Sequence, residues 1–167
     1  MAEVAHEVRT FGDPVLKSRA TRVKEFDEAL KRLAEEMIRI MREHEGVGLA
    51  ANQIGRLKRI FVAACEDEEY TIVNPVIEEK SESTEKDMEG CLSIPETRVE
   101  VERSQAVTVS GKDLSGAPVR IRAEGLLARI FQHEIDHLDG ILILDRTDRE
   151  SRKNALREMR ERMLSRR

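Results

Sequence analysis

Two histidines and a glutamate stand close together in the segment Phe131–His137, which reads Phe-Gln-His-Glu-Ile-Asp-His. His133 and His137 are four residues apart, so on a helix both imidazoles lie on one face and can bind a single metal ion. Glu134 would then lie beside a water activated by that metal and could take its proton. The H-E-x-x-H pattern therefore predicts a metal-dependent hydrolase.

The pattern fixes only three positions, so it also occurs by chance on solvated helix faces. The sequence around it indicates whether this helix is buried. Apolar residues recur at helical spacing over 123–138, and Gly140 follows where helices often end. These apolar residues are Leu126, Leu127, Ile130, Phe131 and Leu138. Histidines and a glutamate facing a core are costly unless they are paired or bound to a metal, so a metal site is favoured.

A third ligand is needed, because catalytic zinc sites use three protein ligands and keep a fourth position for water. Glu158 is one candidate, since it lies 21 residues after His137 on a second predicted helix, as in thermolysin-like proteases. Cys91 is the other candidate, in a short predicted loop over 89–95 with a glycine before the thiol and a proline after it. Cys65 ends an apolar strand and is predicted to be a small core residue. The residues alone leave Glu158 and Cys91 both open.

Helices and strands that would hold these segments can be predicted from hydrophobic spacing. A long amphipathic helix begins at Phe26–Asp27 and stops at Gly46. An acidic turn over 66–69 joins the first two strands as a solvated hairpin tip. The segments predicted as strands are 57–65, 70–78, 98–110 and 118–122.

The final segment, 149–167, is predicted to be a basic helix. It holds eight basic and three acidic residues, a net charge of +5 in a chain whose net charge is −4. A basic helix on an acidic body favours docking onto a polyanion such as RNA. An ordinary solvated helix with charge pairs fits the same pattern equally well.

Length and composition bound the class of protein. The 167 residues suit one domain with a sizeable core, and no repeat or linker divides them, so 1–167 is predicted to be a single domain. Residues 1–10 lack an apolar run and include Glu3 and Glu7, which disfavours a signal or transit peptide. No segment is long and apolar enough to span a bilayer, and two cysteines in a reducing compartment predict no disulfide. We therefore expect a soluble, cytosolic protein with no membrane partner.

A third segment, Gly46–Gln53, reads Gly-Val-Gly-Leu-Ala-Ala-Asn-Gln, and its glycines let a backbone approach a ligand closely. Alone it could be a helix end followed by a turn of small residues. Together with Glu-Gly-Cys-Leu-Ser and His-Glu-Ile-Asp-His, in this order, it resembles the three motifs of bacterial-type peptide deformylases. The resemblance spans Gly46–Gly140 and implies removal of the formyl group from the initiator methionine of nascent polypeptides. It also implies an α+β fold, with antiparallel sheets around a central metal-binding helix, a long N-terminal helix and a C-terminal helix.

The resemblance implies a role for each matched residue. Cys91, His133 and His137 resemble the metal ligands, and Glu134 resembles the general acid/base. The side-chain amide of Gln53 and the backbone N–H of Leu92 would stabilise the oxygen of the tetrahedral intermediate. By analogy, the substrate pocket would be lined by Val47, Gly48, Leu126 and Ile130. Glu89 and Arg98 would bind the substrate near the mouth of this pocket.

The identity of the metal and two alternative functions stay open at this point. Ligand softness predicts zinc for a Cys/His/His site. The resemblance implies one Fe²⁺ per chain, with Zn²⁺, Ni²⁺ or Co²⁺ able to replace it, and we expect iron. The alternatives are a zinc endopeptidase that uses Glu158, and a non-catalytic module that binds the ribosome or RNA through 149–167.

Overall fold

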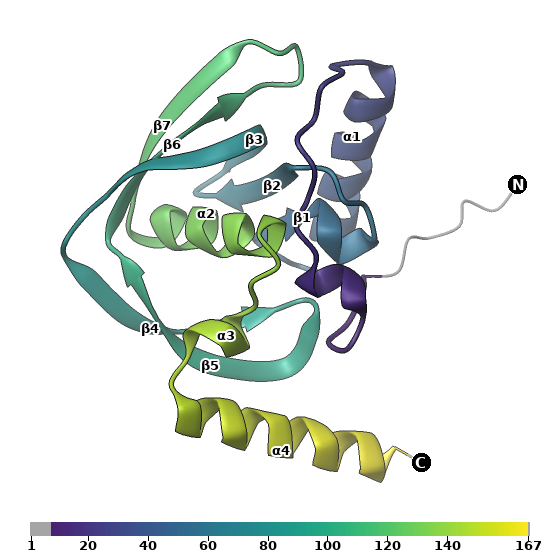
Figure 1. The fold of residues 1–167 in the computed structure, drawn as a ribbon, viewed down its shortest axis with the longest axis vertical. Coiled ribbons are helices and arrows are strands. Elements are labelled where there is room, and N and C mark those ends of the chain that lie inside the picture. The colour runs from purple at the N-terminus through teal and green to yellow at the C-terminus, as the bar shows by residue number, and fades with distance from the viewer. Residues whose placement is uncertain (1–7, 167) are drawn as a thin grey trace, which may run out of the picture.

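The protein has an α+β architecture in a computed structural model that describes residues 8–166 (Figure 1). Five antiparallel strands form one sheet in the order β1-β2-β3-β6-β7, and β4 and β5 form a separate hairpin. The strands are β1 (Gly48–Ala50), β2 (Ile60–Cys65), β3 (Glu68–Lys80), β4 (Thr84–Cys91), β5 (Ile94–Ser104), β6 (Ala106–Lys112) and β7 (Pro118–Glu124). The helices are α1 (Glu28–Glu43), α2 (Gly125–Leu138), α3 (Ile143–Arg146) and α4 (Arg149–Ser165), with short 3₁₀ helices η1 (Pro14–Lys17) and η2 (Ala51–Ile54). This arrangement confirms the predicted fold class.

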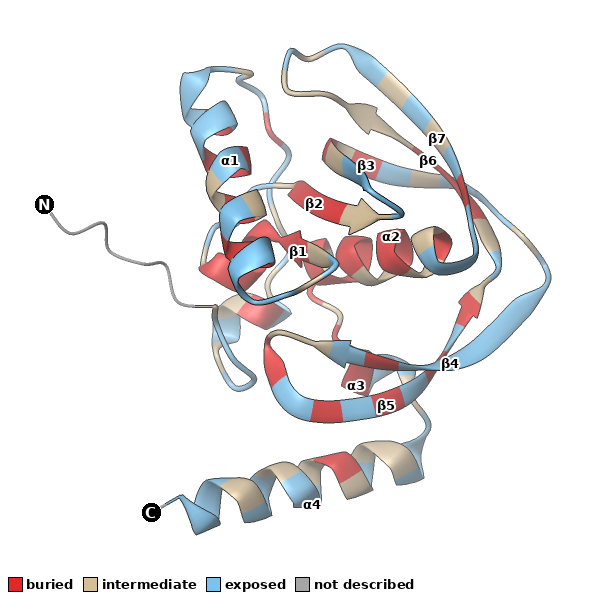
Figure 2. Cartoon of the chain, turned by 180° about the vertical axis from the view of Figure 1, so that it is seen from behind, coloured by how far each residue is buried: buried red, intermediate tan, exposed pale blue. Residues whose placement is uncertain are grey.

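Strand β2 is buried on both faces and so has a helix on each side. Successive side chains of a strand point to opposite faces. Ile60 and Val62 pack in a cluster with α1, whereas Phe61 and Ala63 pack in a second cluster with α2. Both β2 and α2 are accordingly mostly buried (Figure 2). The sheet therefore holds α2, the helix with the H-E-x-x-H pattern, in the interior of the molecule.

The β4–β5 hairpin lies on the other side of α2, where it belongs to a third hydrophobic cluster. Alternate residues of β5, among them Val99 and Val101, point inward and pack with α3. Helix α4 adds Ala155, which is buried, and lies along β5 (Figure 1). Near the end of α4, the apolar side chain of Met163 is 69% exposed.

Several predicted element boundaries are wrong. The segment 98–110 is not one strand, because the chain leaves β5 at Gln105 and begins β6 in the other sheet. The segment 89–95 is the tip of a β-hairpin rather than a loop. Helix α2 begins at Gly125, since the preceding residues complete β7 and Gly125 turns the chain with a φ of 59°. Leu126 is 61% exposed and does not belong to the buried stripe of this helix.

Other predicted elements are confirmed. Helix α1 starts after Asp27, whose carboxylate accepts a hydrogen bond from the backbone N–H of Leu30 at 3.0 Å. The acidic turn joins β2 and β3 through Glu66 and Asp67, both in the left-handed region. Among residues 8–166, no helix is long and apolar enough to cross a membrane. The prediction about a leader peptide concerns Glu3 and Glu7, which lie outside the described residues.

Candidate metal centre and active site

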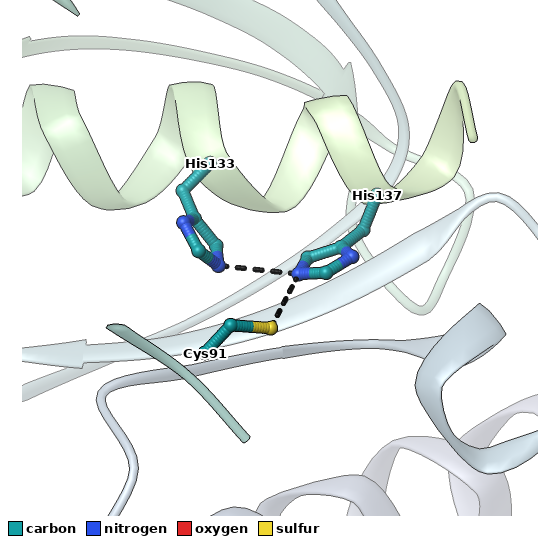
Figure 3. Close-up of side chains that lie close together, drawn as sticks. All are labelled: Cys91, His133 and His137. Carbon is teal, nitrogen blue, oxygen red and sulfur yellow. Dashed lines mark hydrogen bonds between the residues drawn. The ribbon is translucent and has the colours of Figure 1, made fainter. Parts of the chain in front are cut away.

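Three potential metal ligands converge between α2 and the tip of the β4–β5 hairpin (Figure 3). The Nε2 atom of His137 is 3.1 Å from Nε2 of His133 and 3.3 Å from Sγ of Cys91. The three ligand atoms all lie within 4.8 Å of one another. Glu158 is exposed on α4 and is not part of this group. Of the two candidate third ligands, the fold therefore brings Cys91 to the histidines.

The spacing of these groups fits a divalent metal. Bonds of about 2.0–2.1 Å to nitrogen and 2.3 Å to sulfur place tetrahedral donors roughly 3.3–3.6 Å apart, close to the two distances from Nε2 of His137 to the other donors. The Nδ1 atom of His133 is 2.8 Å from a carboxylate oxygen of Glu89, so Nδ1–H donates and Nε2 is left to bind a metal. Burial alone would lower the pKa of His133, but Cys91 and Glu89 outweigh it and hold this pKa well above its usual value, so a metal would have to displace a proton from this residue. Burial, helped by the neighbouring His133, holds the pKa of His137 well below its usual value. His137 is therefore neutral, as a metal ligand must be.

Glu89 lies buried behind His133, with only 6% of its surface exposed, and not at an open pocket mouth. Its carboxylate accepts hydrogen bonds from Nε and Nη2 of Arg103, both at 3.0 Å, and from Arg129. Burial alone would raise the pKa of Glu89, but the bonds to His133 and Arg103 lower it to about 2. Glu89 is therefore a fixed anion that orients the imidazole of His133.

The ion pairs continue beyond Glu89 to helix α3. Arg103 also donates to Asp136, which in turn accepts two bonds from Arg146, at 3.0 and 2.8 Å. Sequence reasoning missed Arg103 and Asp136. A signal for Arg103 was available in the sequence. Alternate residues of a strand point to the same face, so Arg103 points inward as Val99 does, and a buried arginine requires carboxylate partners.

Glu134 is a buried carboxyl group with an unusual pKa. It is 3% exposed, and its Oε1 atom has no hydrogen-bond partner in the described part of the chain. Burial raises the pKa of Glu134 to about 7, and the charge of Glu89 adds to this, although His133 opposes it. A carboxyl group that titrates near neutrality suits general acid/base catalysis.

Gly48 in β1 explains why the glycine-rich segment lies next to α2. A Cβ atom added to Gly48 would lie 2.4 Å from Oε2 of Glu134 and 2.8 Å from its Cδ. These separations are too short for any side chain, so only glycine lets the carboxylate occupy this position. The segment predicted to approach a ligand closely thus packs against the carboxyl group of Glu134.

The side-chain amide of Gln53 is held beside the thiol of Cys91. Its Oε1 atom accepts a hydrogen bond from the backbone N–H of Ala50 at 2.9 Å, so the NH₂ group must point the other way. That Nε2 atom donates to Oγ of Ser93 at 3.1 Å and lies 3.6 Å from Sγ of Cys91. Leu92 lies between Cys91 and Ser93 in the hairpin turn, so Gln53 and the backbone of Leu92 flank the same thiol.

The remaining residues predicted to bind a substrate lie in different environments. Val47 and Leu126 are large apolar residues that are 54% and 61% exposed. Ile130 is buried in the cluster between α2 and the sheet. Arg98 is exposed and donates to the backbone carbonyl of Met88 at 3.1 Å. The contacts of these residues with a substrate stay a prediction.

Replacing Glu89 with glutamine is expected to reduce the acid sensitivity of the metal-free protein. The pKa of Glu89 is lower in the folded protein than its ordinary 4.5, so its charge stabilises the fold above pH 4.5 and this stabilisation disappears as the pH falls through about 2. The shift corresponds to about 3 kcal/mol. Urea unfolding at neutral and low pH measures the free energy of unfolding, with the exposed Glu100→Gln variant as control. If this free energy depended on pH equally in Glu89→Gln and in the wild type, the prediction would be contradicted.

Comparison with known proteins gives a consistent result. A sequence model described as polypeptide deformylase matches residues 5–153. The chain is 50% identical over 154 residues to peptide deformylase 1 of Corynebacterium glutamicum, covering 90% of this chain and 91% of that protein. It is 51% identical over 141 residues to peptide deformylase of Thermotoga neapolitana, covering 84% and 86%.

Solved structures agree with these relatives. The crystal structure of peptide deformylase from Thermotoga maritima matches with a TM-score of 0.84 at 47% identity, covering 86% of this chain and 97% of that one. The peptide deformylase from Synechococcus elongatus, in complex with actinonin, matches with a TM-score of 0.89 at 39% identity, covering 95% and 89%.

Proposed function

Because this chain belongs to the peptide deformylase family, whose members remove the N-formyl group from nascent peptides, we propose a role in that hydrolysis for each residue of the site. The metal ligands are Cys91, His133 and His137. Glu134 is the general acid/base, and Gln53 and Leu92 stabilise the developing negative charge. The convergence of the three ligand atoms within 4.8 Å, two of them on the helix that carries Glu134, is the observation that supports this assignment.

The two alternative functions have no support. A zinc endopeptidase would need Glu158 as a ligand, but Glu158 is exposed on α4 while Cys91 lies 3.3 Å from His137. A non-catalytic binding module would not need a buried carboxyl group beside three metal donors. Membership of the family and the metal-donor group both favour the hydrolase.

The chemistry follows from the positions of the side chains. When bound, a divalent cation supplies a Lewis acid that polarises a carbonyl oxygen and acidifies water. Glu134 accepts the proton of the water that attacks the formyl carbon, and it later donates this proton to the amine as the C–N bond breaks. Such proton transfer typically contributes about 10²–10⁴-fold to the rate. The products are formate and a free N-terminal amine.

Gln53 is expected to act on the oxygen of the tetrahedral intermediate, because its Nε2 donor is fixed beside Cys91. The Gln53→Glu variant keeps the acceptor for Ala50 but replaces the N–H donor with an oxygen. We expect kcat to fall about 10²–10³-fold, the usual effect of losing one such donor. Steady-state kinetics on protein of measured metal content would test this, and an unchanged kcat would contradict it.

Gly48→Ala is expected to displace the carboxyl group of Glu134 while the metal ligands remain in place. A misplacement of about 1 Å can cost roughly 10²-fold in rate, so we expect kcat to fall by about that factor with metal content unchanged. The matched control is Gly90→Ala, since a Cβ there meets nothing closer than 3.7 Å. If both variants kept the wild-type kcat, the close packing of Gly48 on Glu134 would not matter for catalysis.

We propose Fe²⁺ as the metal in the cell. A thiolate and two imidazoles suit Zn²⁺, Ni²⁺ or Co²⁺ as well as iron, so the donors alone do not select one. Oxidation of the Cys91 sulfur would remove a ligand, and the iron form should therefore lose activity in air. Metal analysis of protein purified without oxygen, followed by reloading with each cation, tests this assignment.

We propose that the methionine side chain of the substrate contacts Val47, Leu126 and Ile130, apolar residues on the segments that hold Gly48 and Glu134. Val47 and Leu126 have the exposed surface that such a contact needs, whereas Ile130 could contribute only from within the core. Arg98, exposed on β5, could reach the peptide chain beyond the methionine. For Glu89, whose carboxylate is already bonded to His133, the positioning role described above is favoured over direct contact with the substrate.

The wider setting of the protein is proposed on the same basis. Residues 1–167 would form one catalytic domain in the cytoplasm, where nascent chains are made, without a disulfide partner. Helix α4 could contact the ribosome through exposed Arg149, Lys153, Arg157 and Arg160, which share one side of the helix. Replacing these four residues with glutamine should weaken co-sedimentation with ribosomes and leave hydrolysis of a short peptide unchanged. Unaltered co-sedimentation would exclude this contact.

The experiment that tests the function is formate release from a formyl-methionyl tripeptide by anaerobically purified, Fe²⁺-loaded protein. Release by the wild type but not by Glu134→Ala would support both the reaction and the role of the base. No release despite one bound metal per chain would overturn the assignment.

A further inference from the structure

Two segments rich in basic residues lie side by side on the surface, although they are far apart in the sequence. Residues 17–24 read Lys-Ser-Arg-Ala-Thr-Arg-Val-Lys and residues 56–59 read Arg-Leu-Lys-Arg, giving seven basic and no acidic residues. The backbone N–H of Thr21 donates to the carbonyl of Leu57, and that of Arg59 donates to the carbonyl of Thr21, both at 2.9 Å. The first segment is the purple stretch that runs from η1 toward α1 in Figure 1. The chain carries a net charge of −4, so this concentration of positive charge is local.

Most of this charge is not neutralised. Lys17 pairs with Asp145, and Arg59 and Arg19 share Asp139, at 2.8 and 3.7 Å. The other four residues are exposed, and none of them has an ion-pair partner among residues 8–166. These four, which we call the basic face, are Arg22, Lys24, Arg56 and Lys58; they lie on the two segments that the bridge between Thr21 and Lys58 joins. Cations that stabilise no neighbour are available to an external anion.

A groove of about 620 Å³ adjoins the basic face at Arg22. Its other basic residues are Arg59, Lys112 and Arg120, and its one acidic residue is Glu78, which pairs with Arg120 at 2.8 Å. The groove also has apolar walls, formed by Val76, Pro118 and Val119, and Val76 is 56% exposed. Basic residues around a partly apolar hollow match the chemistry of a nucleotide, with its charged phosphate and a flat base whose two faces are apolar.

We propose that the basic face and this groove bind RNA. The phosphates contact Arg22, Lys24, Arg56 and Lys58, and an unpaired base lies in the groove against Val76. RNA is favoured over an anionic membrane because part of the positive charge lines a hollow rather than a flat surface. This inference rests on the proposed function. A deformylase acts on nascent peptides, which emerge from the ribosome, a particle whose surface is largely RNA. This surface is separate from α4 and from the metal ligands.

The test measures binding of the full chain to a fluorescently labelled single-stranded RNA by anisotropy at several salt concentrations. The double variant Arg22→Gln/Lys58→Gln removes two charges from the basic face. The control Lys80→Gln/Lys86→Gln removes two exposed charges near the connection between β3 and β4 that have no ion-pair partner within residues 8–166. We expect the first variant to bind at least about tenfold more weakly and to lower the salt slope by about 1.4, at roughly 0.7 per phosphate contact. The control should bind as the wild type does.

The outcomes separate this inference from the proposed function. Formate release from a short formyl-methionyl peptide should be the same for both double variants and the wild type, because none of these residues lies at the metal centre. A wild type that binds no RNA, or two double variants that weaken equally, would overturn the RNA site. Binding of phosphatidylglycerol vesicles in place of RNA would also overturn it. A wild type that releases no formate would overturn the enzymatic assignment alone.

Discussion

Replacing Glu134 with glutamine is expected to lower kcat for formate release by about 10²–10⁴-fold while the metal stays bound. Glutamine has nearly the same shape, so it fits against Gly48, where a larger change would disturb β1. It cannot accept a proton from water. Glu134 contributes none of the three converging ligand atoms, so the metal content of the variant should equal that of the wild type.

The measurement is kcat at saturating formyl-methionyl tripeptide, with the metal content of each preparation determined in parallel. The pH profile gives a second readout. Burial raises the pKa of Glu134 to about 7 in the metal-free site, so protonation should remove the base as the pH falls. The variant should lack the corresponding loss of activity on the acidic side. Wild-type kcat in a fully loaded Glu134→Gln enzyme would contradict the role of the base.

Replacing Cys91 with alanine is expected to cost the protein its metal. If three or four ligands share the roughly 10–16 kcal/mol by which structural zinc sites bind, losing one weakens binding by about 10²–10⁴-fold. Activity should fall with metal occupancy. The added metal should also stabilise the wild type against heat but not the variant, because a ligand stabilises only what it binds.

Glu158→Gln is the matched control, because Glu158 was the competing third ligand. It is exposed on α4, away from the histidines, so this variant should keep both metal and activity. Metal analysis after dialysis against a weak chelator measures both variants. The opposite pattern, with metal lost from Glu158→Gln and kept by Cys91→Ala, would favour the endopeptidase.

The local parts of the site could be predicted from the sequence. The spacing of His133 and His137 alone places two imidazoles on one helical face, as α2 does. The third ligand could not be derived in this way, because the position of Cys91 depends on how the β4–β5 hairpin packs on α2. That contact joins residues 46 positions apart. It was the resemblance between motifs, rather than spacing, that favoured Cys91.

Local periodicity failed where the environment of an element changes along its length. Leu126 has the spacing of a buried residue, yet the first turn of α2 is exposed because the helix follows directly after β7. Glu89 is one residue in an acidic stretch, and no local signal marks it as the partner of His133. Arg103 could have been found, because the alternation of β5 placed it inward.

The ion pairs from His133 through Glu89 and Arg103 to Asp136 make these residues depend on one another. A single change in the middle leaves a buried charge without its partner, which is far more costly than exchanging a whole pair for neutral groups of similar size. The effects of substituting Glu89 and Arg103 are therefore not additive, and the double change should cost less than the sum of the two. Such epistasis restricts how relatives can diverge at these positions: the residues around His133 can be replaced together more readily than one at a time.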